Sequence, residues 1–149
     1  MKRYPYYRIP IGYMLLFAFF IFASGTWLFL LPQGLTQTGS PVAALQQLVY
    51  TPAVKSWQQF VEIAAPHLFA MGALIFIVAH FLLFSTKISR HFSMRLGFWL
   101  YIAALADIFA YALIITGIVT SGWIKLAALA IFALLFLILL GAVAISLSQ

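Results

Sequence analysis

The sequence contains no cysteine among its 149 residues. A chain without thiols forms no disulfide, and it offers no thiolate for a metal site, no ligand for an Fe–S cluster and no attachment point for a c-type haem. Charged residues are scarce as well, because they make up 7% of the chain and only 2 of them are acidic. Since a soluble domain carries about 25% charged residues, this chain could not cover a surface that faces water.

The residue patterns of common catalytic sites are also absent. The chain has no HExxH motif, no paired carboxylates, no phosphate-binding loop and no cluster of a nucleophile with a base. Its net charge of +6 is not gathered into the basic face that a nucleic-acid-binding domain needs. We therefore expect neither an independent enzyme nor a nucleic-acid-binding protein.

The chain is instead rich in hydrophobic residues, which account for 66% of it. A helix needs about 20 consecutive apolar residues to span a bilayer, and four runs reach that length, at about 11–31, 60–84, 96–119 and 124–147. The first run is longer than the core of a signal peptide, which favours an uncleaved anchor. The sequence predicts an all-α integral membrane protein with one domain over residues 1–149, folded as an up-down-up-down four-helix bundle.

The basic residues predict the orientation of this bundle. Cytoplasmic loops of membrane proteins carry an excess of Lys and Arg, and two segments on one predicted side do so: Lys2, Arg3 and Arg8 before the first span, and Lys87, Arg90 and Arg95 between the second and third. Only Lys55 and Lys125 fall on the other side. We expect both termini in the cytoplasm, in a multi-pass protein of a bacterial inner membrane.

A long outer connection, residues 33–59, joins the first two spans. Its apolar residues Val42, Leu45, Leu48 and Val49 lie opposite two glutamines, which predicts a short interfacial helix. Thr51-Pro52 has the form of an N-cap followed by proline at the first helical position. If the second helix begins there and continues to Thr86, it has about 35 residues and a length of about 50 Å. Its outer end would then project beyond the lipid and be available to another protein.

Two histidines, His67 and His80, lie in the second apolar run, PHLFAMGALIFIVAHFLLF. Their separation along a helix corresponds to a rise of about 20 Å, which places one ring in each leaflet. This single helix resembles those of the di-haem b-type membrane cytochromes, in which one helix carries two histidines about four turns apart. The resemblance implies haem b as cofactor, with His67 and His80 as its metal ligands, and electron transport as the function.

The chain departs from that family in two ways. The two histidines point about 140° apart around the helix, and no other predicted span contains a histidine. The second axial ligand would have to come from a partner subunit, a second copy of the chain, Met14 or His91. Alternatively, His67 bonds to water or headgroups near the outer interface, and His80 bonds to a hydroxyl or carbonyl of a neighbouring helix.

Asp107 lies near the middle of the third span, about 16 Å deep. A carboxylate at that depth finds a donor or stays protonated, and Tyr111, one turn away, could offer its hydroxyl. The pair is a candidate proton relay, or Asp107 makes an interhelical hydrogen bond that stabilises the bundle. Nearer the outer surface, we expect Glu62 and Lys125 to form an ion pair at the membrane boundary.

Three functions are compatible with these residues. The first is a membrane subunit of an electron-transfer complex that binds haem b or contacts quinone through His67 and His80, and docks a partner on its outer face. The second is a structural accessory subunit of a larger complex. The third is a small proton or ion conduit that uses Asp107. In each case the partners are the lipid bilayer and other protein subunits, a second copy of the chain among them.

Overall fold

The computed structural model describes residues 6, 8–31, 40–52, 55–85 and 87–147. Within them the chain forms five α-helices and no strand: α1 (Arg8–Leu30), α3 (Pro41–Tyr50), α4 (Trp57–Leu83), α5 (Arg90–Ile115) and α6 (Trp123–Leu147). The 4 helices α1, α4, α5 and α6 are long and apolar enough to cross a membrane. The predicted all-α fold with four spanning helices is therefore confirmed. Among the residues interpreted above, Lys2, Arg3, Thr86 and the parts 33–39 and 53–54 of the outer connection lie outside the described residues.

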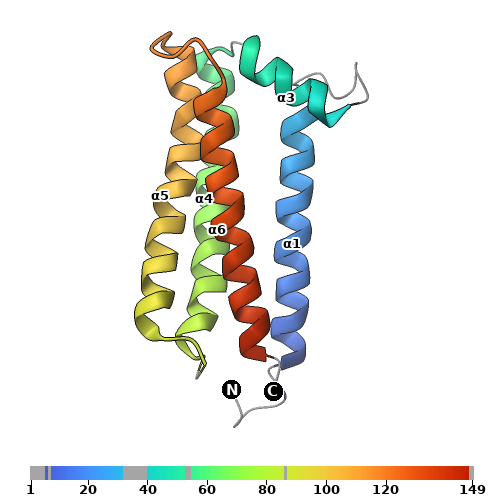
Figure 1. Ribbon diagram of the computed structural model, residues 1–149, viewed down its shortest axis with the longest axis vertical. Coiled ribbons are helices and arrows are strands. Elements are labelled where there is room, and N and C mark those ends of the chain that lie inside the picture. Colours follow the sequence, from blue (N-terminus) through green and yellow to red (C-terminus); the bar gives the residue numbers. More distant parts are fainter. Residues whose placement is uncertain (1–5, 7, 32–39, 53–54, 86, 148–149) are drawn as a thin grey trace.

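The spanning helices alternate in direction, and three of them form a tight group (Figure 1). α5 packs along both α4 and α6, and α4 also contacts α6, whereas α1 packs against α6 and the end of α3. Arg8 and Leu147 lie at the end that carries the α4–α5 connection, and α3 crosses the opposite end. The first helix is thus a neighbour of the last one.

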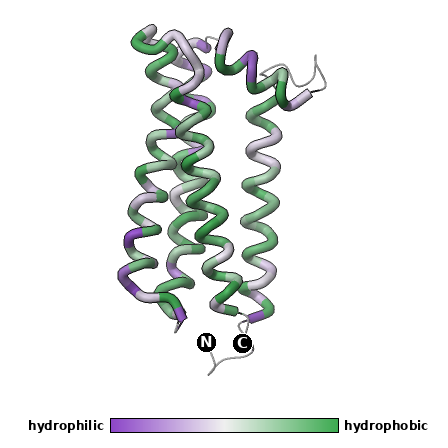
Figure 2. The backbone as a smooth tube through the Cα atoms, viewed as in Figure 1, coloured by the Kyte–Doolittle hydropathy of each residue, from purple (hydrophilic) through white to green (hydrophobic). Residues whose placement is uncertain are grey.

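The interior of this group is filled by aliphatic side chains and narrowed by small residues. Ile75, Leu100 and Leu139, one each from α4, α5 and α6, are fully buried. α5 lies close to α4 at Gly97, where a Cβ would meet that of Ala79 at the ordinary van der Waals distance of 3.7 Å. Small residues favour such close helix contacts in membranes. Figure 2 shows the apolar colour along the middle of the four long helices and the polar colour mainly toward their ends.

The start of α4 differs from the sequence prediction. The helix begins at Trp57, and Pro52 lies outside it. Ser56 is the N-cap: its Oγ accepts the Gln59 N–H at 3.2 Å, and the Gln59 side chain accepts the Ser56 N–H at 3.0 Å. This reciprocal capping box satisfies two free donors, whereas the Thr51 hydroxyl donates back to the Gln47 carbonyl of α3. The prediction of a start at Pro52 was wrong, although α4 with its 27 residues is still the longest described helix.

The predicted short helix in the long connection is α3, and it is docked onto the protein. Of the predicted apolar stripe, Leu48 and Val49 are buried against the rest of the protein, but Val42 is exposed. The carbonyl of Val49 accepts hydrogen bonds from the Gly122 N–H at 3.0 Å and from the Ser121 hydroxyl at 3.1 Å. These bonds attach α3 to the turn between α5 and α6.

α1 is the least buried spanning helix. Its two buried residues, Ile11 and Ala18, both lie in the half nearer Arg8. In the other half, Phe22 contacts the rings of Phe132 and Phe136 on α6, with centroids 6.3 and 5.3 Å apart. Since lipid is as apolar as these side chains, a spanning helix can remain largely exposed to it.

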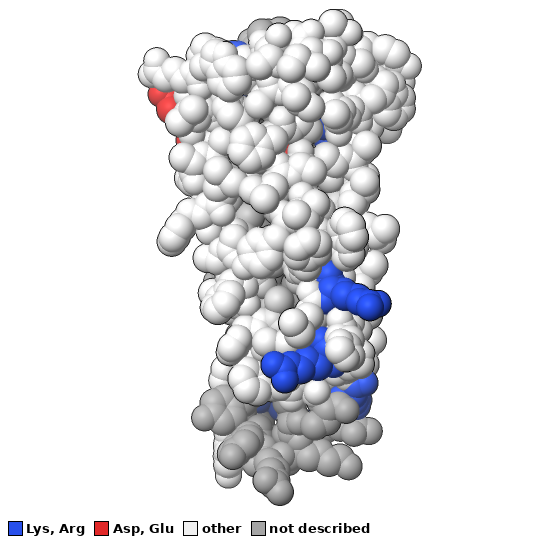
Figure 3. Space-filling view, turned by 90° about the vertical axis from the view of Figure 1, so that its left-hand side faces the viewer, with Lys and Arg blue, Asp and Glu red and all other residues white. Residues whose placement is uncertain are grey.

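Most of the basic side chains lie toward one end of the long axis of the molecule. On the face that Figure 3 shows, Lys and Arg side chains gather over the half that contains the α4–α5 connection, whereas acidic atoms and a few basic ones lie toward the opposite end. This asymmetry is the one from which we expect the basic end to face the cytoplasm. The orientation in the membrane stays a prediction.

Candidate functional site

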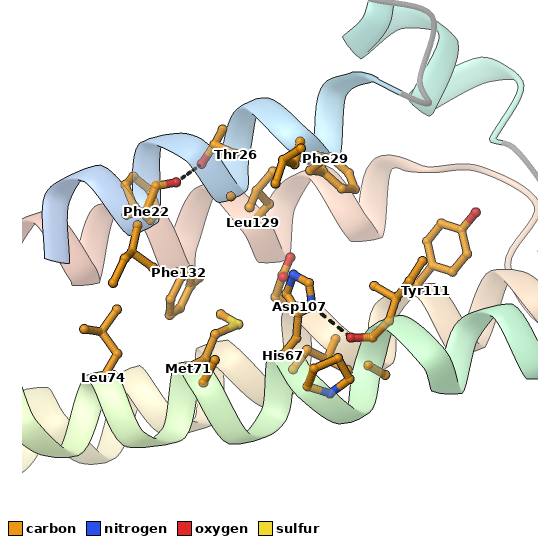
Figure 4. Close-up of a pocket in the computed structure, with 18 of the residues that line it drawn as sticks. Phe22, Thr26, Phe29, His67, Met71, Leu74, Asp107, Tyr111, Leu129 and Phe132 are labelled. Atoms are coloured by element: carbon orange, nitrogen blue, oxygen red, sulfur yellow. Dashed lines mark hydrogen bonds between the residues drawn. The ribbon is translucent and has the colours of Figure 1, made fainter. Parts of the chain in front are cut away.

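A cavity of about 560 Å³ lies between α1 and the other three spanning helices (Figure 4). Apolar side chains from α1, α4 and α6 form most of its wall, among them Phe22, Met71, Leu74 and Phe132. The loosely packed half of α1 lines one side of it, from Ile21 to Phe29. Its volume falls within the range of about 300–1,000 Å³ that is typical of small-molecule sites.

The polar groups of the cavity lie toward one end. In Figure 4, Asp107, His67 and Tyr111 lie toward the end nearer α3, whereas Leu74 and Phe132 lie toward the other end. Lys55 and Lys125 line the cavity as well. The cavity thus combines an apolar body with a polar, charged end.

Asp107 and Lys125 form a buried ion pair at this end. The Lys125 Nζ lies 2.7 Å from Asp107 Oδ1 and also donates to the Asp107 main-chain oxygen at 2.8 Å. The side chains of Lys125 and Asp107 are 9% and 10% exposed, so both charges are largely removed from solvent. The pair connects α5 to α6 and faces the cavity.

This pairing replaces the one that we expected from the sequence. The predicted ion pair between Glu62 and Lys125 was wrong, since Glu62 accepts a hydrogen bond from Gln58 at 3.0 Å and Lys125 is bound to Asp107. The sequence contained a signal for the true pair. Asp107 needs a cation as its partner. The next helix in the chain runs antiparallel to the helix of Asp107, and Lys125 is its only basic residue.

Tyr111 lies one turn beyond Asp107, and its ring faces a cation. The Lys55 Nζ is 5.6 Å from the centre of the ring, and Tyr111 is 8% exposed. On the other side of the cavity, the Lys125 Nζ is 5.2 Å from the ring centre of Phe29. Both distances are within the reach of a cation–π contact. The sequence analysis assigned neither Lys55 nor Phe29 to a site. Lys55 lies outside the predicted spans, and Phe29 is apolar.

His67 lies at the mouth of the cavity, directly after Pro66 in α4. Its Nδ1 lies 2.8 Å from the carbonyl oxygen of Ile63. Because a carbonyl oxygen only accepts, this nitrogen carries the proton, and in the neutral ring Nε2 is then an acceptor. His67 therefore offers the cavity an acceptor, or a ligand for a metal ion.

His80 lies outside the cavity. Its ring stacks on Phe76 at 5.7 Å and meets the edge of Phe84 at 5.1 Å. The structure therefore does not bring His67 and His80 into one site. This separation agrees with their different directions around the helix.

The histidines do not fit a haem that is held by two histidines of this chain. Among the described residues His67 lines the cavity and His80 lies outside it, so these two rings do not face one haem from opposite sides. His91, another suggested ligand, is exposed in the first turn of α5. Met14 lies on α1 but does not line the cavity.

The comparisons with known proteins identify a family. The model of the family Aq_1264_TM, described as a transmembrane helical domain, matches residues 39–149. This segment contains α3 to α6, and α1 precedes it. No curated protein and no solved structure matches the chain.

Proposed function

The chain belongs to the Aq_1264_TM family of transmembrane helical domains, and we propose that it is a membrane subunit that binds a lipid-soluble molecule with a polar head. The observation that carries this proposal is the cavity of about 560 Å³, apolar along its length and charged at one end. Such a cavity suits a ligand that has an apolar body and hydrogen-bonding atoms at one end.

The cavity also has a suitable route from the membrane. α1 packs against α6 and α3 rather than along α4, and His67 at the mouth is an exposed residue of α4. A ligand dissolved in the bilayer would reach the cavity between these two helices without crossing water.

A quinone is the member of this ligand class that would make the chain an electron-transfer subunit. Its ring carbonyls accept hydrogen bonds, for which Lys55 is a donor, and the hydroxyls of the reduced form donate, for which His67 Nε2 is an acceptor. Its isoprenoid tail would lie along the apolar wall. Partner subunits would then provide the remaining redox centres.

The two other functions have different support. A structural accessory role is favoured by the Asp107–Lys125 pair, since it joins two helices through a charged hydrogen bond. A proton conduit would use Asp107 as a relay, but this carboxylate is already bound to an ammonium group. We therefore place ligand binding first and the structural role second.

The experiment compares two variants of the same helix. Gly25 lines the cavity and Gly12 does not, and a Cβ at either position meets no atom within 4 Å. We expect the ring of Gly25→Phe to occupy part of the cavity and the ring of Gly12→Phe to project into lipid. The chain is isolated with its native partners in mild detergent, and its extracted lipids are identified by mass spectrometry.

A quinone or other polar-headed lipid should copurify with the wild type and with Gly12→Phe, and be depleted in Gly25→Phe. Equal lipid content in all three samples would reject the cavity as a ligand site and favour the accessory role. Photolabelling with an azidoquinone in membranes provides a second readout that does not require the ligand to survive detergent.

A further inference from the structure

The charges that line the cavity do not balance. Lys55 and Lys125 line it together with one carboxylate, Asp107. Asp107 accepts from Lys125, so this carboxylate is already neutralised. The other acidic residue of the chain, Glu62, does not line the cavity, and its carboxylate accepts a hydrogen bond from the neutral side chain of Gln58.

Lys55 is therefore the cation that the cavity does not neutralise. It is half-buried, and its ammonium group lies over the Tyr111 ring. Among the described residues the one salt bridge is that of Lys125 with Asp107. An ammonium group that is partly removed from water favours an anion beside it.

Lys125 adds a second donor toward the same space. An ammonium group has three N–H bonds, and two acceptors on Asp107 use two of them. The remaining one makes no hydrogen bond with the described residues, and the ammonium group lies 5.2 Å from the centre of the Phe29 ring. Two lysines from different segments thus approach one end of the cavity, while its long wall is apolar.

We propose that the head group bound here is an oxyanion, a phosphate or carboxylate carried on a lipid tail, with Lys55 as its main contact and Lys125 as its second. This inference rests on the proposed function and names the chemical class of its ligand. The tail lies along the apolar wall toward Leu74 and Phe132. A neutral head of the same size leaves Lys55 without a counter-charge.

The test uses ligands that differ only in the head. Binding of radiolabelled hexadecyl phosphate, palmitate and hexadecanol to the purified full chain is measured in a neutral detergent, and binding to Gly25→Phe is subtracted as partition into the micelle. We expect hexadecyl phosphate or palmitate to bind about tenfold or more tightly than hexadecanol, because a charge-assisted hydrogen bond is about twice as strong as a neutral one. The preferred anion tells a phosphate from a carboxylate head.

Variants of the lysine assign the preference to its charge. Lys55→Gln should remove most of the difference between anionic and neutral ligands, and Lys55→Arg should retain it. Arg95→Gln, on an exposed residue near the start of α5, is the matched control and should bind like the wild type. The Arg variant keeps the test valid if the Gln variant folds poorly.

Three other results would overturn the oxyanion proposal, and one of them would overturn the proposed function as well. Equal binding of anionic and neutral ligands would overturn the oxyanion proposal and leave the cavity function intact. No binding above that of Gly25→Phe for any ligand would overturn both. Full competition by inorganic phosphate at similar concentration would show that a free anion, and not a tailed one, is the ligand, which also overturns the proposal.

Discussion

The Lys125 Nζ lies 2.7 Å from Asp107 Oδ1 and 2.8 Å from the main-chain oxygen of the same residue. One side chain of α6 thus holds both a charge and a backbone acceptor of α5. The hydrogen bond from Lys125 to the main-chain oxygen does not involve the carboxylate, so a different residue at position 107 could still accept it. The pair therefore aligns the two helices and also sets the polar end of the cavity.

The first prediction concerns the stability of this pair. Lys125→Met or Asp107→Leu alone leaves a buried charge without its partner, and we expect each to lower the stability by about 3–5 kcal/mol. The double variant removes both charges and should recover most of that loss, since apolar residues of similar volume often replace such pairs without cost. The measurement is thermal unfolding in detergent. Arg95→Met is the control. If the single variants unfolded at the same temperature as this control, the prediction would be contradicted.

The ion pair also shows where sequence reasoning was limited. Asp107 was recognised because a carboxylate deep in a spanning helix is costly and has to be paired. Lys125 was assigned to the boundary because it stands third in α6, and helix position alone does not tell in which direction a long side chain extends. Counting cations on the adjacent helix would have found it.

The four spans, in contrast, could be predicted from hydropathy, because a bilayer demands long apolar helices. The position of α1 could not. In water, an apolar stripe indicates which face of a helix is buried, but in lipid both faces of α1 are apolar, as Phe17 and Phe20 on exposed positions and Ala18 on a buried one illustrate. The cavity beside α1 consequently has no sequence signature.

The second prediction tests the start of α4. Ser56→Ala removes the capping hydrogen bond to Gln59, and we expect a loss of about 1 kcal/mol. Thr51→Ala is the matched control, since Thr51 would be the N-cap if the helix began at Pro52. Its hydroxyl makes an exposed bond to Gln47 of α3, so the effect should be smaller. A larger loss for Thr51→Ala than for Ser56→Ala would favour the earlier start.

The third prediction concerns the docking of α3. A Cβ at Gly122 would overlap the carbonyl of Leu48, so Gly122→Ala should displace α3 and cost about 1–3 kcal/mol. Limited proteolysis should then cut the chain between α3 and α4 more rapidly. Gly141→Ala, whose Cβ meets no atom within 4 Å, should leave the rate unchanged. Equal cleavage of both variants would mean that α3 is not held by this contact.

The fourth prediction tests the orientation in the membrane. Because the chain has no cysteine, one introduced thiol reports a single site without background. His91→Cys lies at the basic end and Thr120→Cys in the turn at the other end, both on exposed residues. A membrane-impermeant maleimide should label Thr120→Cys in intact spheroplasts and His91→Cys only in inverted vesicles. The reverse pattern would place the basic end outside.

The fifth prediction separates the two histidines of α4. His67 lines the cavity and keeps Nε2 available, whereas His80 packs between Phe76 and Phe84 away from it. We expect His67→Ala to weaken the binding of hexadecanol, whose hydroxyl can donate to Nε2, by about three- to tenfold, the effect of one hydrogen bond, and His80→Ala to leave it unchanged. His67→Gln, which retains an acceptor, should restore part of the affinity. Binding of the labelled ligands to the purified variants is the measurement.

A reduced-minus-oxidised visible spectrum of the natively isolated complex accompanies the binding measurement, because it reports on the two histidines independently of the cavity. His80 is an exposed residue of α4 and does not line the cavity, so a residue of another chain could complete a metal site with its ring. If a haem band were present and vanished in His80→Ala, the haem would be bound between this chain and a partner, and the cavity would not be its site. If the band vanished in His67→Ala instead, the imidazole at the mouth would be a haem ligand, and the lipid-soluble ligand would have to share the cavity with it.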